Sequence, residues 1–199
     1  IGTIATVIAT ALGTLAALGL SRPHMPYKGL IMAILISPMI FTLIITAEGM
    51  FFFYARINLV YTFTGVILAH VALATPFVVI TVTATLVGFD MNMVKAAQSL
   101  GAKPIRTFFK VIMPLILPGI ISGALFAFIT SFDEVVVVMF MASIDQLTIP
   151  KQMWAGIRQE ISPVILCMAT CLVLLSIFLL TTVELLRRRS EKLRGIKAR

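Results

Sequence analysis

The sequence predicts an all-α membrane protein that crosses the bilayer several times. Of its 199 residues, 60% are hydrophobic and 12% are charged, and the mean hydropathy is +1.08. An ordinary soluble domain has about 25% charged residues. The apolar runs are long and show no sustained alternation of polar and apolar residues. They therefore favour membrane-spanning helices over a membrane β-barrel.

Five hydrophobic segments are about long enough to cross a bilayer, since a spanning helix needs about 20 apolar residues. These segments are 1–20, 30–48, 60–87, 115–141 and 162–186. We treat residues 1–199 as a single membrane domain, in which connections 21–29, 49–59, 88–114 and 142–161 join the spans and a basic tail, 187–199, follows.

Positive charge is concentrated on one side of this domain. Connection 21–29 has two basic residues and no acid, connection 88–114 has four basic residues and one acid, and tail 187–199 has seven basic residues and one acid. Basic residues mark the cytoplasmic ends of spans, so we expect these segments and the C-terminus in the cytoplasm. This placement of the net charge of +8 favours membrane orientation and contact with lipid, and no nucleic-acid partner is expected.

Five spans with a cytoplasmic C-terminus put Ile1 outside. The sequence begins with no Met and no basic flank. We therefore expect a further span to precede Ile1 in a longer protein.

Connection 88–114 is predicted to form a helix, a break and a second helix. Good helix formers run up to Gly101, which suits a left-handed helix end, and Pro104 suits the first turn of the next helix. The second helix would lie at the membrane surface, with an apolar face and a basic stripe. The apolar residues are Ile105, Phe108, Phe109 and Ile112, and the basic residues are Arg106 and Lys110. The small side chains of Ala96 and Ala97 would let a partner protein pack closely.

The spacing of this connection resembles the EAA loop found in permease subunits of bacterial ABC importers. In that pattern Ala-Ala is followed by three residues, Gly, nine residues, an aliphatic residue, one residue, an apolar residue and Pro. Here the pattern runs Ala96-Ala97, Gly101, Val111, Met113 and Pro114. Lys95 departs from the family's usual Glu and reverses its charge.

The resemblance implies a polytopic helical bundle of the type I ABC importer permease kind, whose EAA loop forms a cytoplasmic coupling helix. The residues that it assigns to contact with the ATPase are Lys95, Ala96, Ala97, Ser99, Leu100, Gly101 and Pro114. It also implies a bacterial inner membrane location and four partners. These are a cytoplasmic ATPase dimer, a second homologous permease, a periplasmic substrate-binding protein and a small substrate.

The chain itself is expected to be neither an enzyme nor an ATP-binding subunit. It carries no Gly-x4-Gly-Lys-Ser/Thr phosphate loop. The resemblance implies that ATP and Mg are bound by the partner ATPase, so no cofactor is expected in this chain.

A second block, residues 131–165, resembles permeases for spermidine and putrescine. It begins "SFDEVVVV" and continues to "LTIP" and "ISPVI". This resemblance implies a polyamine or a related cationic amine as the substrate. Permeases for opines and amino-acid-derived amines share similar blocks and stay open as alternatives.

Asp133 and Glu134 are the candidate substrate-path residues, because they fall inside the predicted fourth span. An acid at the bilayer centre costs about 2.5–3.5 kcal/mol and usually faces a water-filled path. Adjacent helical residues point about 100° apart, so one acid would line the path, and Asp133 is favoured. Two acids open to the outside would attract a polycation. The alternatives are an interhelical ion pair and a helix with a shorter membrane core.

The sequence leaves two other interpretations open. In an ion-driven secondary transporter, Asp133 and Glu134 would be the coupling acids, and in a membrane scaffold the basic loop would only recruit a partner.

Two packing features are also predicted. His70 is expected to form a helix-to-helix hydrogen bond, and the pair Gly119 and Gly123 is expected to let another helix approach closely.

Overall fold

The computed structural model describes residues 1–22, 25–87, 92–159 and 163–193, so Asp90 and the last six residues of the basic tail lie outside it. Every element in the described ranges is helical. In chain order they are α1 (Gly2–Leu20), α2 (Lys28–Ile40), α3 (Leu43–Arg56), α4 (Phe63–Val87), α5 (Asn92–Ser99), α6 (Pro104–Thr107), the π-helical turn η1 (Phe108–Ile112), α7 (Met113–Phe132), α8 (Val136–Met141), α9 (Ile149–Gln159) and α10 (Pro163–Leu193).

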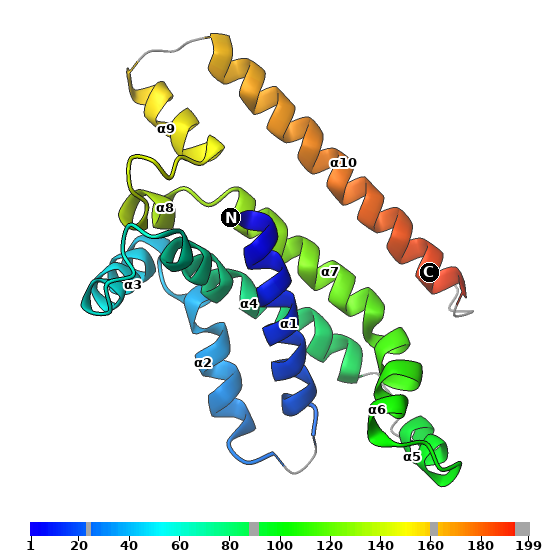
Figure 1. The fold of residues 1–199 in the computed structure, drawn as a ribbon. Coiled ribbons are helices and arrows are strands. Elements are labelled where there is room, and N and C mark those ends of the chain that lie inside the picture. Colours follow the sequence, from blue (N-terminus) through cyan, green and yellow to red (C-terminus); the bar gives the residue numbers. More distant parts are fainter. Residues whose placement is uncertain (23–24, 88–91, 160–162, 194–199) are drawn as a thin grey trace.

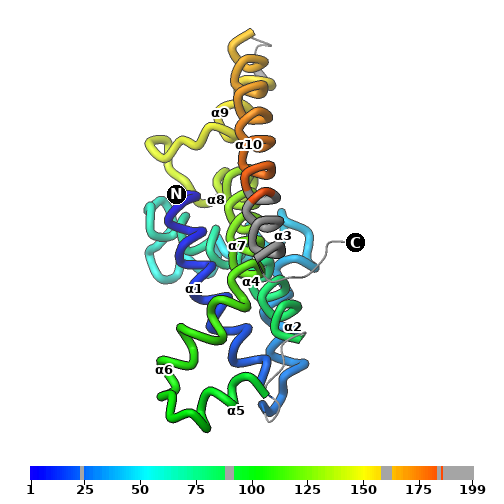
Figure 2. Tube along the Cα trace, turned by 90° about the vertical axis from the view of Figure 1, so that its right-hand side faces the viewer, coloured from blue at the N-terminus to red at the C-terminus, as the bar shows by residue number. Residues whose placement is uncertain are grey.

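Helix α4 is the centre of the bundle. It is apolar all around and contacts α1 and α7, which also contact each other. Figure 1 shows α5 and α6 projecting at one end, α8 and α9 at the opposite end, and α10 on the outside of the bundle. Helix α10 contacts α7 and α9. Seen from the side, α5 and α6 again form the end that lies farthest from α9 (Figure 2).

The second of the five expected spans is not a single straight helix in the structure. Within the described residues, α1, α4, the continuous helix Pro104–Phe132 and α10 are long and apolar enough to cross a membrane. The predicted span 30–48 is instead divided between α2 and α3, which meet at an angle of 108°. If this bent pair is one span, the number is five. The bend falls at Phe41, which is extended, and at Thr42, which has non-helical backbone angles, directly after the turn that contains Pro38.

The predicted fourth span, 115–141, is also interrupted. Helix α7 ends at Phe132, the short helix α8 begins at Val136, and Asp133 and Glu134 lie in the break between them. The expectation that these two acids sit inside one continuous helix was therefore wrong. The valines that follow are β-branched and favour a helix less than straight-chain residues do.

Glycines let α1 and α7 approach α4 on both sides of Val78. A methyl group on Gly13 of α1 would come within 2.8 Å of Val78 Cγ1, and one on Gly123 of α7 would come within 3.0 Å of Val78 Cα. The methyl group on Gly123 would also overlap the Thr81 hydroxyl, and one on Gly119 would overlap the Thr85 hydroxyl. The close approach predicted from the glycine pair is thus confirmed, and the neighbouring helix is α4.

The apolar core consists of two clusters that share α4. The first joins α1, α4 and α7 around Val78 and Ile116. The second joins α3, α4 and α8 around Val66 and Val138. Because α4 contributes to both clusters, it links the end of the bundle that carries α8 to the end that leads toward α5 and α6.

Substitution Gly123→Ala is expected to destabilise the protein by about 1–3 kcal/mol, because the added methyl group forces α7 away from α4. Thermal unfolding in detergent measures the change. Gly19→Ala is the matched control, since nothing lies within 4 Å of a methyl group at that helical position. Equal melting temperatures for the two variants would contradict the close packing of α7 on α4.

Candidate functional site

Helix α5 ends in the left-handed cap that the sequence predicted. Gly101 has φ +79°. Its N–H donates to the Gln98 carbonyl oxygen at 2.9 Å, and the Ala102 N–H donates to the Ala97 carbonyl oxygen at 3.1 Å. This pair of bonds is the Schellman motif, in which glycine is favoured because other residues are strained at positive φ. The turn fixes the direction in which the chain leaves α5.

The chain then continues through α6 and η1 into α7 as one long helix. Pro104 occupies the first turn of α6, as the sequence predicted. The π-helical turn η1 precedes α7, and such turns commonly mark a bend in a helix. Ile112 packs against the cluster around Val78, and Ile116 is fully buried in that cluster. The α5–α6 projection is therefore attached directly to the packed core.

The predicted coupling residues lie mostly on the surface of this projection. Lys95, Ala96, Ser99, Gly101 and Pro114 are exposed, and Ala97 is half-buried. Leu100 is 88% exposed, and Ile105 is 75% exposed. The basic residues Lys95, Lys103, Arg106 and Lys110 on the same projection are exposed as well.

Asp133 and Glu134, the two acids of the predicted path, have different environments in the break between α7 and α8. Asp133 is exposed and caps the C-terminal end of α7, where its N–H donates to the Ile129 carbonyl oxygen at 3.0 Å. Glu134 is only 6% exposed, and its carboxylate accepts a hydrogen bond from the Val137 N–H at 2.8 Å. Glu134 thus holds the first turn of α8, while the Asp133 side chain is exposed.

His70 forms the interhelical hydrogen bond that the sequence predicted. Its Nδ1 lies 2.7 Å from the Ser131 hydroxyl oxygen, in a buried contact between α4 and the last turn of α7. The distance does not distinguish which of the two groups donates. The bond fixes the helix end that immediately precedes Asp133.

Gln146 is a buried residue that the sequence analysis did not single out. Its amide nitrogen donates to the Tyr61 carbonyl oxygen at 3.0 Å, and its amide oxygen accepts from the Ser143 N–H at 3.2 Å. The Tyr61 N–H in turn donates to the Met141 carbonyl oxygen at 2.9 Å. These bonds tie the segment after α8 to the segment before α4. No sequence pattern marks this role, because it depends on a contact between residues far apart in the chain.

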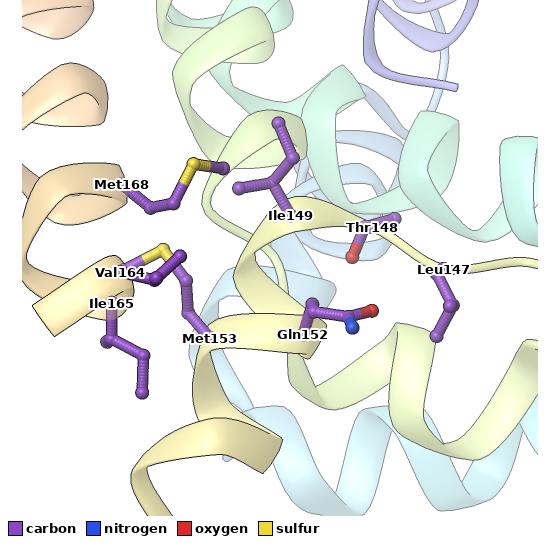
Figure 3. Close-up of a pocket in the computed structure, with 8 residues that line it drawn as sticks. All are labelled: Leu147, Thr148, Ile149, Gln152, Met153, Val164, Ile165 and Met168. Carbon is purple, nitrogen blue, oxygen red and sulfur yellow. The ribbon is translucent and has the colours of Figure 1, made fainter. Parts of the chain in front are cut away.

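A groove of about 310 Å³ lies between α9 and α10, at the same end of the bundle as the acidic break. Figure 3 shows its lining side chains, which come from the segment just before α9, the start of α9 and the start of α10. They are Leu147, Thr148, Ile149, Gln152, Met153, Val164, Ile165 and Met168. The groove has no acidic lining residue, so it does not offer a cation the charge that Asp133 offers.

The two candidate regions lie at opposite ends of one helix. Pro114 stands in the first turn of α7, and Asp133 caps its far end. With a rise of 1.5 Å per residue, the 20 residues of α7 separate them by about 30 Å. The structure therefore joins the exposed α5–α6 projection to the break that contains the two acids through one packed helix.

A bundle of this form is typical of a membrane subunit of a transport system. The sequence pattern of the family described as "Binding-protein-dependent transport system inner membrane component" matches residues 9–192. This match covers nearly the whole chain, and the chain belongs to that family. The predicted family resemblance is confirmed, and the protein is a multi-pass permease subunit of the inner-membrane type.

Two relatives are polyamine permeases by name. The spermidine/putrescine transport system permease protein PotC of Haemophilus influenzae is 30% identical over 187 residues, which are 94% of this chain and 73% of the relative. The putrescine transport system permease protein PotI of Escherichia coli strain K12 is 36% identical over 103 residues, which are 52% of this chain and 37% of the relative.

The fold also matches a solved structure. A chain of the MetNI methionine ABC transporter, in a structure titled as inward facing, superposes with a TM-score of 0.70. The match covers 95% of this chain and 93% of that chain at 17% sequence identity. At this identity the likeness concerns the fold alone, and it confirms the predicted type I ABC importer permease architecture.

Substitution Glu134→Ala is expected to lower the free energy of unfolding by about 1–2 kcal/mol, because the Val137 N–H loses its acceptor. Glu134→Gln keeps a carbonyl oxygen for this bond and is the matched control. Thermal unfolding of the purified protein compares the two variants. Equal stability of the alanine variant and the wild type would contradict the capping role of Glu134.

Proposed function

We propose that the chain is a transmembrane permease subunit of an ATP-driven ABC importer that carries polyamines, such as spermidine and putrescine, or related cationic amines. The observation that carries this proposal is the likeness to PotC over nearly the whole chain. It is supported by the exposed Asp133 in the break between α7 and α8. A carboxylate at a path through the membrane attracts a polycation and repels anions.

In this proposal Asp133 contacts the substrate, and Glu134 keeps the break in place. The exposure of Asp133 and the burial of Glu134 support this division of roles. A buried carboxylate that already accepts a backbone N–H has less capacity left for a substrate ammonium group.

The α5–α6 projection would be the coupling helix that contacts a cytoplasmic ATPase dimer. Its exposed apolar side chains and its small residues Ala96 and Ala97 support close docking. ATP binding would close the ATPase dimer, and the attached α7 would carry the movement to the acidic break. The C-terminus would lie on the same cytoplasmic side, which agrees with its seven basic residues.

The opposite end of the bundle would face the periplasm and receive substrate from a binding protein. Helix α9 and the segment tied by Gln146 form this end (Figure 1). A second, homologous permease would supply the other half of the path. The family description, which names a binding-protein-dependent system, supports the first of these partners.

Substitution Gly101→Asp is expected to abolish most substrate uptake while ATP hydrolysis continues. A side chain at φ +79° strains the turn that orients α5, so the ATPase contact is displaced. Uptake of labelled spermidine and ATP turnover are measured together in proteoliposomes that contain the assembled transporter. Gly29→Asp is the matched control, because it adds the same charge on the predicted cytoplasmic side without a positive φ. Unchanged uptake by the Gly101 variant would contradict the coupling role.

Substitution Asp133→Asn is expected to raise the apparent KM for spermidine about tenfold, which corresponds to the loss of about 1.4 kcal/mol of attraction. Initial uptake rates over a range of spermidine concentrations measure this effect. Asp145→Asn is the control, because Asp145 is an exposed acid at the same end of the bundle. An unchanged KM for the Asp133 variant would contradict its place in the substrate path.

A further inference from the structure

His70 is a large polar side chain buried in a predominantly apolar core. Only 1% of its surface is exposed, and its Nε2 has no hydrogen-bond partner among the described residues. A polar atom that is buried without a partner lowers the stability of the folded protein. An aliphatic side chain of similar size would avoid this cost, so packing alone does not account for a histidine at this position.

The Nδ1 of the same ring makes a specific contact. It meets the Ser131 hydroxyl at 2.7 Å and so joins the middle of the bundle to the last turn of α7. Ser131 is itself buried. The contact also lies against the first turn of α1, since a methyl group on Gly2 would come within 3.7 Å of the Ser131 hydroxyl oxygen. The end of α7 is thus held where three helices meet.

The break is fixed on both sides, and Asp133 stands between the two attachments. On one side His70 holds Ser131, and on the other side Glu134 holds the Val137 N–H. Asp133 is the one exposed residue between Ser131 and Val138. Two attachments this close leave the Asp133 backbone little freedom, although its side chain is open to a ligand.

We propose that His70 is a positioning residue: through its hydrogen bond to Ser131 it holds the end of α7 on α4 and so sets the position of Asp133 toward a cationic substrate. This inference rests on the proposed function of Asp133. It goes further because it assigns a role to a buried side chain that touches neither the substrate nor a partner.

The first test measures spermidine uptake by His70→Leu and Ser131→Ala in the assembled transporter. Each substitution is made both with Asp133 present and in the Asp133→Asn background. With Asp133 present, the apparent KM is expected to rise about fivefold, with a smaller change in maximal rate. In the Asp133→Asn background neither substitution is expected to raise the KM further. A role in general stability would instead change the KM equally in both backgrounds, and that result would overturn the inference.

Two controls accompany this test. Thr75→Val removes a hydroxyl group that donates a hydrogen bond within α4, to the Val71 carbonyl oxygen at 2.6 Å. Because this bond joins no two helices, the KM of the Thr75→Val variant is expected to equal that of the wild type. Ser131→Thr keeps a hydroxyl group and is expected to retain most of the affinity. If His70→Leu fails to fold, Ser131→Ala alone decides the outcome, and an unchanged KM for that variant overturns the inference.

A second readout does not depend on transport. In a background in which Cys167 and Cys171, both exposed on α10, are replaced by alanine, Asp133→Cys introduces a single thiol. Its rate of modification by a cationic thiol reagent is compared with and without Ser131→Ala. A change of at least about threefold is expected, because the end of α7 is released. An unchanged rate would overturn the positioning role. An unchanged KM for Asp133→Asn alone would instead overturn the proposed place of Asp133 in the substrate path.

Discussion

The packing of α1 and α7 on α4 and on each other is the constraint on which the rest of the structure depends. Val78 lies between Gly13 and Gly123, where neither neighbouring helix has room for a methyl group. In a membrane, helices are not driven together by the exclusion of water, so close packing of small residues has to supply much of the attraction. The hydroxyl groups of Thr81 and Thr85 bond to their own helix, which leaves no unpaired donor at these contacts.

This packing explains how two distant regions belong to one mechanical unit. The α5–α6 projection continues into α7, and Ile112 and Ile116 anchor the start of that helix in the core. At the far end His70 anchors Ser131, and Asp133 follows two residues later. A force applied to the projection therefore acts on a helix that is held along its length, and the break beyond Phe132 is the first place where the chain changes direction.

Much of this arrangement could be predicted from sequence, because the signals were local. The cap at Gly101, the helix start at Pro104 and the close approach at Gly119 and Gly123 each depend on residues a few positions apart. The bend between α2 and α3 and the break at Asp133 were missed, because hydropathy measures length and apolar character but not continuity. The sequence predicted that the two adjacent acids differ and favoured Asp133 for the path, but it did not predict that Glu134 caps α8, since that role follows from where α7 stops. Gln146 has its role through Tyr61, which lies far away in the sequence.

Our central proposal is that the α5–α6 projection and the acidic break move together as one body. Spin labels at Leu100 and Ile144, each 88% exposed, report the distance between the two ends by pulsed electron paramagnetic resonance in the assembled transporter. The account predicts that this distance within the chain stays the same with and without trapped ATP, while the distance from each label to its counterpart on the neighbouring permease changes. A change in the distance within the chain, with the distances between permeases unaltered, would contradict it.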